Sequence, residues 1–144
     1  MELELMVAWS DAMGSGVPEL DDADRRIKLL LLELNQAIAD DREGEEIQRL
    51  MYQLLTEVVS HCESEERVLT QCSYPLAKGH AALHFQMRSE LVHAMQELRN
   101  ANVRTMRAEY VLLVTQLLVE HMRQETTKYR KYLQSSSASG SQGA

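Results

Sequence analysis

No apolar run of the roughly 18 residues that a membrane-spanning helix requires occurs in this sequence, so we expect no segment that crosses a membrane. The first residues, MELELMVAWSDAM, are acidic where a secretory signal would be basic, and we therefore expect a cytoplasmic protein. Basic side chains are in the minority, with 15 lysines and arginines against 22 aspartates and glutamates. The resulting net charge of -7 argues against a nucleic-acid partner.

Cysteine and proline are scarce, with two of each. Cys62 and Cys72 lie on one predicted helix, about 15 Å apart along its axis, so they cannot pair there and we expect reduced thiols that serve as packing residues. Pro18 opens a predicted helix with acids in its first turn. Pro75 follows Tyr74 in a break between two further helices.

Apolar residues recur at spacings of three and four along four stretches, which predicts four amphipathic helices. These stretches are about 18–40, 47–72, 76–100 and 107–133, with the loop DDREGEE after the first. Their short connections predict one all-α domain, an up-down-up-down four-helix bundle over residues 19–133. Residues 1–18 are predicted to form an irregular arm, whose Met6, Val7 and Trp9 would pack over an end of the domain. Residues 134–144 are predicted to be a disordered tail.

The spacing also predicts which residues face the core. The four faces comprise Ile27, Leu31, Leu34 and Ile38; Ile47, Met51, Leu54, Val58, His61, Glu65, Val68 and Cys72; Leu76, His80, Leu83, His84, Met87, Leu91, Ala94 and Leu98; and Tyr110, Val114, Leu117, Leu118, His121 and Glu125. His93 lies about 180° from His84 around its helix, so we expect it to face solvent.

Polar residues interrupt three of these faces in pairs. The pairs are His61 and Glu65, His80 and His84, and His121 and Glu125. A spacing of four is close to one helical turn, so both members of a pair project from the same face. An unpaired buried carboxylate costs several kcal/mol, so Glu65 requires a cation or a hydrogen-bond donor. Three such pairs on three helices indicate a transition-metal site.

The antiparallel order of the helices brings these pairs to one end of the core, together with the acids at 21–24. Four histidines and at least two carboxylates suit a pair of non-haem irons better than magnesium or calcium, which prefer oxygen ligands alone. Zinc fits less well, because structural zinc sites close with four ligands and this set is larger. A single iron also fits less well than a pair.

This pattern resembles the bacterial hemerythrins and the wider hemerythrin/HHE-type cation-binding domains over nearly the whole globular part. The matching elements are Trp9, VPELD before the first helix, HxxxEE from His61 to Glu66, YPxxxxHxxxH from Tyr74 to His84, His121 and Tyr129. The resemblance implies a bundle that holds two oxo- or hydroxo-bridged iron ions and, in the best-known members, binds dioxygen reversibly.

The resemblance also assigns the ligands. One iron would be held by His80, His84 and His121. The other would be held by His61, with Glu65 bridging the two.

The chain departs from the family at two ligand positions. The family's first helix usually supplies a histidine just after its Leu-Asp opening, where this chain has Asp24. The family's second bridging acid follows His121 by five residues, at Thr126. Glu125 lies about 40° from His121 around the helix, against about 140° for position 126, so we predict that Asp24 and Glu125 are the substitutes. The alternatives are that Asp24 only favours the helix dipole and that Glu125 is solvated.

Three aromatic pocket positions of the family also differ. They are occupied here by Cys62, Met87 and Leu117, whereas Leu118 matches the family's pocket leucine. Bulky rings exclude water from bound dioxygen, so their loss would open the site and favour oxidation of the metal. An added carboxylate would act in the same direction, because negative charge stabilises ferric iron.

Three hypotheses of function follow. The first is a di-iron protein that binds dioxygen for storage, transport and delivery, or sensing. The second is an enzyme of the oxidase or peroxidase type, acting on ferrous iron or peroxide. The third is an interaction module with a partly lost metal site. The expected small-molecule partner is dioxygen or peroxide, and the sequence does not identify a protein redox partner.

Overall fold

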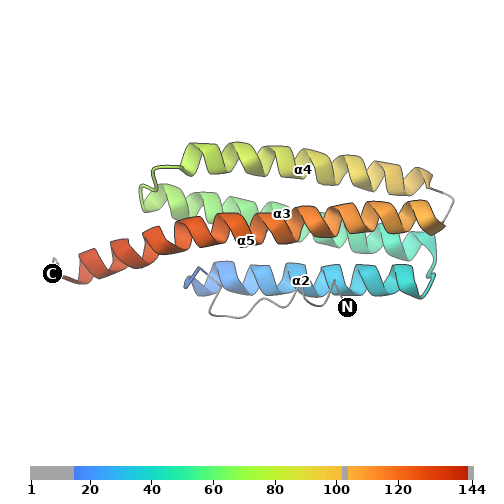
Figure 1. Cartoon of the computed structure of the whole chain (residues 1–144), viewed down its shortest axis with the longest axis horizontal. Helices are drawn as coiled ribbons and strands as arrows, with labels where there is room; N and C mark the ends of the chain where they lie inside the picture. The colour runs from blue at the N-terminus through green and yellow to red at the C-terminus, as the bar shows by residue number, and fades with distance from the viewer. Residues whose placement is uncertain (1–14, 102–103, 143–144) are drawn as a thin grey trace.

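The structure, a computed structural model, describes residues 15–101 and 104–142, which form four α-helices and no strand. The helices are α2 (Pro18–Ala39), α3 (Gly44–Gln71), α4 (Ala77–Asn100) and α5 (Arg104–Gln142). Figure 1 shows them lying side by side, and each packs on the next, with α5 closing the bundle against α2. The predicted all-α, up-down-up-down four-helix bundle is confirmed. Within the described residues, no helix combines the length and the hydropathy needed to cross a membrane.

The start of α2 is held by hydrogen bonds from the preceding segment. The carboxylate of Asp21 accepts from the backbone N–H of Ser15 at 2.7 Å and of Gly16 at 3.1 Å, and from the hydroxyl of Ser15 at 2.8 Å. Gly16 has φ +85°, a conformation that glycine adopts without steric cost. Pro18 then opens the helix, where its missing N–H costs nothing. These contacts fix the turn of α2 that carries Asp24.

Three helix boundaries differ from the expected ranges, including the start of α5 at Arg104. α3 begins at Gly44, inside the stretch expected as a loop, and acids at 45 and 46 favour a helix N-terminus there. α5 continues to Gln142, so its helix extends through residues 134–142, where the sequence predicted a tail. A helix that is already nucleated extends at little cost, because each added residue contributes a hydrogen bond. Residues 1–14 of the predicted arm, with Met6, Val7 and Trp9, lie outside the described residues.

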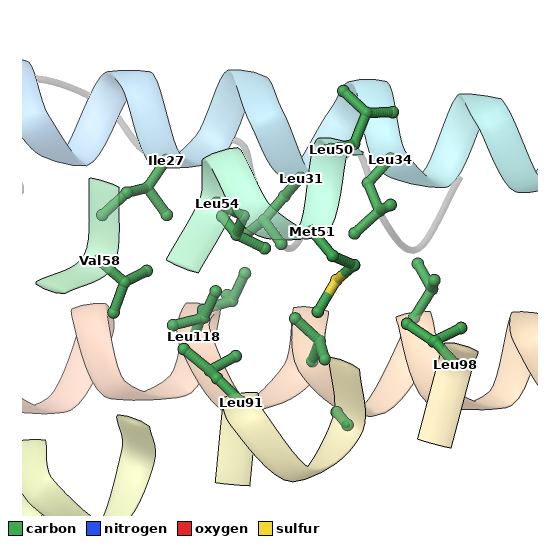
Figure 2. Close-up of a cluster of buried hydrophobic side chains, with 14 of the residues drawn as sticks. Ile27, Leu31, Leu34, Leu50, Met51, Leu54, Val58, Leu91, Leu98 and Leu118 are labelled. Carbon is green, nitrogen blue, oxygen red and sulfur yellow. The ribbon is translucent and has the colours of Figure 1, made fainter. Parts of the chain in front are cut away.

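Buried aliphatic side chains from all four helices form the main core (Figure 2). Its labelled members are Ile27, Leu31, Leu34, Leu50, Met51, Leu54, Val58, Leu91, Leu98 and Leu118. A second and smaller group, the end cluster, lies at the other side of the predicted site. It consists of the buried residues Leu20, Leu69, Tyr74 and Tyr129.

Among the described residues, eight predicted core positions are not fully buried: Ile38, Val68, Cys72, Leu76, Leu83, Tyr110, Leu117 and His121. Leu76 and Leu83 are 59% and 43% exposed, so the core face of α4 is narrower than predicted. Val68 and Cys72 are only half-buried, and Leu69 enters the end cluster instead. The prediction followed steps of four and three, which track a period of 3.5, whereas a straight helix has 3.6 residues per turn and its buried face drifts.

Polar residues lie between most of the main core and the end cluster on every helix; the main-core residues Cys62 and Met122 directly follow His61 and His121. On α2, Asp24 lies between Leu20 and Ile27, and on α3 the pair His61 and Glu65 lies between Val58 and Leu69. On α4, His80 and His84 lie between Ala77 and Met87, and on α5, His121 lies between Leu118 and Tyr129. We call these six residues the polar layer: Asp24, His61, Glu65, His80, His84 and His121.

Candidate metal centre

Four members of the polar layer from three helices are arranged so that they could hold a metal ion. Glu65 on α3, His80 and His84 on α4, and His121 on α5 each offer one ligand atom, and these atoms all lie within 4.8 Å of one another. The His84 ring centroid lies 4.2 Å from that of His80 and 4.9 Å from that of His121. His121 is half-buried, whereas the other three are buried. Solvent therefore reaches the group from the α5 side.

Two imidazole nitrogens of this group, from His80 and His84, point at one carboxylate oxygen of Glu65. His84 Nε2 lies 3.1 Å from Glu65 Oε1 and 3.1 Å from His121 Nε2. His80 Nε2 also contacts Glu65 Oε1. Three imidazoles and one carboxylate oxygen form a donor set that suits iron or zinc rather than magnesium or calcium.

The other carboxylate oxygen of Glu65 faces a different set of groups. Oε2 lies 2.8 Å from His61 Nε2, and it accepts a hydrogen bond of 2.8 Å from the hydroxyl of Tyr129. Glu65 is only 1% exposed, so solvent satisfies neither oxygen. One oxygen thus faces His80 and His84 and the other faces His61, which is the arrangement that a carboxylate bridging two cations needs.

Asp24 completes the second half of the site. Its Oδ1 lies 3.2 Å from His61 Nε2 but has no hydrogen-bond partner among the described residues. Both side chains are buried, and a buried oxygen without a partner is costly. A cation between Asp24, His61 and Glu65 Oε2 would satisfy that oxygen, so the residues present fit a second metal ion as well as the first.

Burial and the neighbouring histidines set the charge states of the two carboxylates. Burial raises the pKa of Asp24 to about 6, although the positive charges of His61 and Lys28 oppose the rise. Burial also disfavours the ionised form of Glu65, but hydrogen bonds from His61, His80 and His84 outweigh it and hold the Glu65 pKa well below its ordinary value. Glu65 is therefore ionised without a metal, and the N–H groups of these histidines stabilise its charge.

The negative charge of Glu65 in turn favours the protonated form of His61. Its burial disfavours the protonated ring, but the hydrogen bond and the negative charge of Glu65 outweigh burial and raise its pKa. A metal ion requires neutral imidazole, so its binding would release this proton.

Two residues that contact the site were not among those predicted to form it. Tyr129 was noted only for its match to the family, and its hydroxyl proves to hold Glu65 Oε2. Glu66 was noted only as the last letter of HxxxEE, and its Oε1 lies 3.1 Å from His84 Nδ1. Two sequence features could have indicated these contacts: the tyrosine eight residues after His121, and the two consecutive glutamates at 65 and 66.

A family model of the hemerythrin HHE cation binding domain matches residues 15–133, and that range contains the whole polar layer. This chain belongs to the hemerythrin HHE family. No curated protein matches the chain. The family and the group formed by Glu65, His80, His84 and His121 together indicate a domain that binds a cation.

The remaining predicted positions of this hemerythrin domain are placed as follows. Leu118 is buried in the main core, one helical turn before His121. Cys62 and Met87 are buried there too, and Leu117 packs against it. Glu125 and Thr126 lie within α5, but their side chains are outside the description, so their ligation stays a prediction.

The structure also places the two cysteines and His93, which were not predicted as ligands. Cys62 and Cys72 are both free, and Cys62 is buried. Burial raises the pKa of the Cys62 thiol, which keeps it protonated and unreactive. His93 is exposed, as predicted from its angle on α4.

Proposed function

We propose that this hemerythrin domain binds two iron ions and, through them, dioxygen for storage, delivery or sensing. The observation that carries the proposal is the orientation of Glu65. Its Oε1 contacts His80 and lies 3.1 Å from His84 Nε2, while its Oε2 lies 2.8 Å from His61 Nε2. A carboxylate with ligands gathered at each oxygen supports a site for two cations rather than one.

The residues present divide into two ligand sets that share Glu65. His80, His84 and His121 would hold the first iron. His61 and Asp24 would hold the second, with Glu125 as a further predicted ligand. Ferrous iron, when bound, would supply the electrons needed to bind dioxygen. Tyr129 keeps Glu65 in its orientation by donating to Oε2, while the main core excludes water from the opposite side.

One specific observation favours the second candidate, an enzyme of the oxidase or peroxidase type. Asp24 Oδ1 lies 3.2 Å from His61 Nε2, so the second half of the site offers two carboxylates, from Asp24 and Glu65, and one imidazole. Negative charge around iron stabilises the ferric state. The smaller residues Cys62 and Met87, in place of the family's aromatic rings, act in the same direction.

Adding oxygen to the anaerobically reduced, iron-loaded protein separates these candidates. A spectral change that reverses under vacuum supports oxygen binding, whereas sustained oxidation of added ferrous iron or consumption of peroxide supports the enzyme. The matched variants are His84→Ala, which removes a buried ligand, and His93→Ala, which removes an exposed histidine of the same helix. Iron-independent behaviour of the parent protein would refute both candidates and leave the interaction module.

A further inference from the structure

We infer that Glu66 is a positioning residue that fixes the proton of His84 on Nδ1 and thereby turns the His84 Nε2 lone pair toward the metal. This inference rests on the proposed metal site at Glu65, His80, His84 and His121. It assigns a separate role to each acid of the doubled glutamate: Glu65 inside the site and Glu66 behind one of its ligands.

The contact is direct and joins two helices. Glu66 Oε1 on α3 lies 3.1 Å from His84 Nδ1 on α4, while the opposite nitrogen of the same ring, Nε2, lies 3.1 Å from Glu65 Oε1. His84 is 0% exposed and the Glu66 side chain is 29% exposed. The imidazole is therefore held between two carboxylates, one at each ring nitrogen.

Metal binding decides where the neutral ring carries its proton. Without a metal, His84 Nε2 lies 3.1 Å from Glu65 Oε1 and donates a hydrogen bond to that carboxylate. When Nε2 binds a metal through its lone pair, the ring's proton must lie on Nδ1, where Glu66 Oε1, 3.1 Å away, accepts it. A ligating histidine that donates its other N–H to a carboxylate is fixed in orientation and is a more basic ligand.

His61 provides the contrast within the same site. Its Nε2 faces Asp24 and Glu65, but its Nδ1 is buried without a hydrogen-bond partner among the described residues. His84 therefore has a carboxylate behind it where His61 has none. We therefore expect the His84 imidazole to donate more electron density to its metal than the His61 imidazole does.

The first experiment measures the affinity of the metal-free full chain for Co²⁺ by competition with a chelator. The variants are Glu66→Ala and Glu66→Gln, with Glu63→Ala as the control, because Glu63 is an exposed glutamate on the same helix. We expect Glu66→Ala to weaken Co²⁺ binding by about 10- to 100-fold, as loss of such a partner does elsewhere. Glu66→Gln keeps an acceptor oxygen and should restore part of the affinity, and Glu63→Ala should match the parent.

The second experiment reads the position of the proton without any metal. Nitrogen NMR of histidine-labelled, metal-free protein should show a proton on His84 Nδ1 in the parent and in Glu66→Gln. Glu66→Ala should lose this proton and keep only the proton on Nε2, which faces Glu65. A merely structural role for Glu66 would not produce this change.

The outcomes are distinct. If Glu66→Ala resembles Glu63→Ala in both affinity and tautomer, the inference is wrong. If Glu66→Ala fails to fold, Glu66→Gln decides, because its loss of charge alone should raise the reduction potential of the iron-loaded protein, and an unchanged potential contradicts the inference. If the parent binds no Co²⁺, the proposed function fails, while the tautomer still tests what Glu66 does to His84.

Discussion

Glu65 is a carboxylate held ionised where solvent cannot reach it. Histidine nitrogens and the Tyr129 hydroxyl surround it, and hydrogen bonds from the histidines keep its pKa far below the ordinary value despite burial. Such a group stabilises the fold only while its partners remain, because breaking a buried pair leaves an uncompensated charge. In the metal-free protein those partners are histidine N–H groups and the Tyr129 hydroxyl, and in the loaded protein cations would replace the histidine protons.

At the scale of single residues, removing a ligand should remove a metal. His84→Ala and His61→Ala should each sharply lower the iron bound per chain, because each deletes a buried imidazole whose Nε2 lies near Glu65. His93→Ala should leave iron content and melting temperature nearly unchanged, since His93 is exposed. Metal analysis of the purified variants is the measurement, and unchanged iron in both ligand variants would refute the assignment of the site.

The pKa of Asp24 predicts a pH dependence in the metal-free protein. Its folded-state pKa of about 6 exceeds the ordinary 3.8. The contribution of Asp24 to the free energy of unfolding is therefore fully present below pH 3.8 and is lost as the pH rises through about 6. Asp24→Asn should abolish the loss, which amounts to about 3 kcal/mol between about pH 4 and pH 7.

Denaturant unfolding in the presence of a chelator measures this contribution. The comparison with Asp24→Asn is needed to separate the effect of Asp24 from that of Glu65. The pKa of Glu65 is lowered, so its contribution to stability is lost as the pH falls. Parallel stability curves for the two proteins would mean that Asp24 carries no such contribution.

At the scale of the helices, hydrophobic periodicity predicts most of the fold. Steps of three and four place the starts of α2 and α4 within a residue of where they occur and bring the polar pairs to one level. The same pattern misplaces Leu76 and Leu83 because it does not specify how far each helix is rotated against its neighbours.

Contacts between side chains on different helices could not be predicted from the sequence. The Tyr129 hydroxyl meets Glu65 across 64 residues of sequence, and Glu66 meets His84 across 18. Helical spacing relates residues within one helix only, so neither contact follows from it. The residues of the polar layer were predicted as ligands and are brought together by the fold, but their binding of iron stays a prediction.

The link between α5 and α3 can be tested through two neighbouring tyrosines. Tyr129→Phe removes a buried hydrogen bond to an ionised group and should cost about 1.5–3 kcal/mol of unfolding free energy. Tyr132→Phe removes hydrogen bonds to the backbone carbonyls of Cys72, which is half-buried, and Ser73, which is exposed, and should cost about 0.5–1.5 kcal/mol. Urea unfolding of the metal-free variants gives both values, and a larger cost at Tyr132 would reverse our ranking of the two contacts.

For the molecule as a whole, the cation should stabilise the native state over the unfolded chain. The residues of the polar layer lie close together only in the folded state. A cation present at 100 times its dissociation constant should therefore raise the free energy of unfolding by about 2.7 kcal/mol. Chelation should therefore lower the melting temperature, and re-addition of Fe²⁺ under anaerobic conditions should restore it. His84→Ala is the control, because its response to Fe²⁺ should be much smaller. Equal melting temperatures for loaded and stripped parent protein would contradict this expectation.

We expect the polar layer to divide the bundle into two cooperative units of very different size. The main core contains 19 buried residues from all four helices, whereas the end cluster contains four, and the Tyr129–Glu65 hydrogen bond links the end cluster to the site. The end cluster should therefore open by itself in sub-global fluctuations, and more often when the metal is removed. Hydrogen exchange should show the amides around Leu20 and Leu69 losing protection on chelation while those around Leu54 keep theirs. The metal would then enter and leave through the opening of one end, at a rate set by local unfolding rather than by unfolding of the whole bundle.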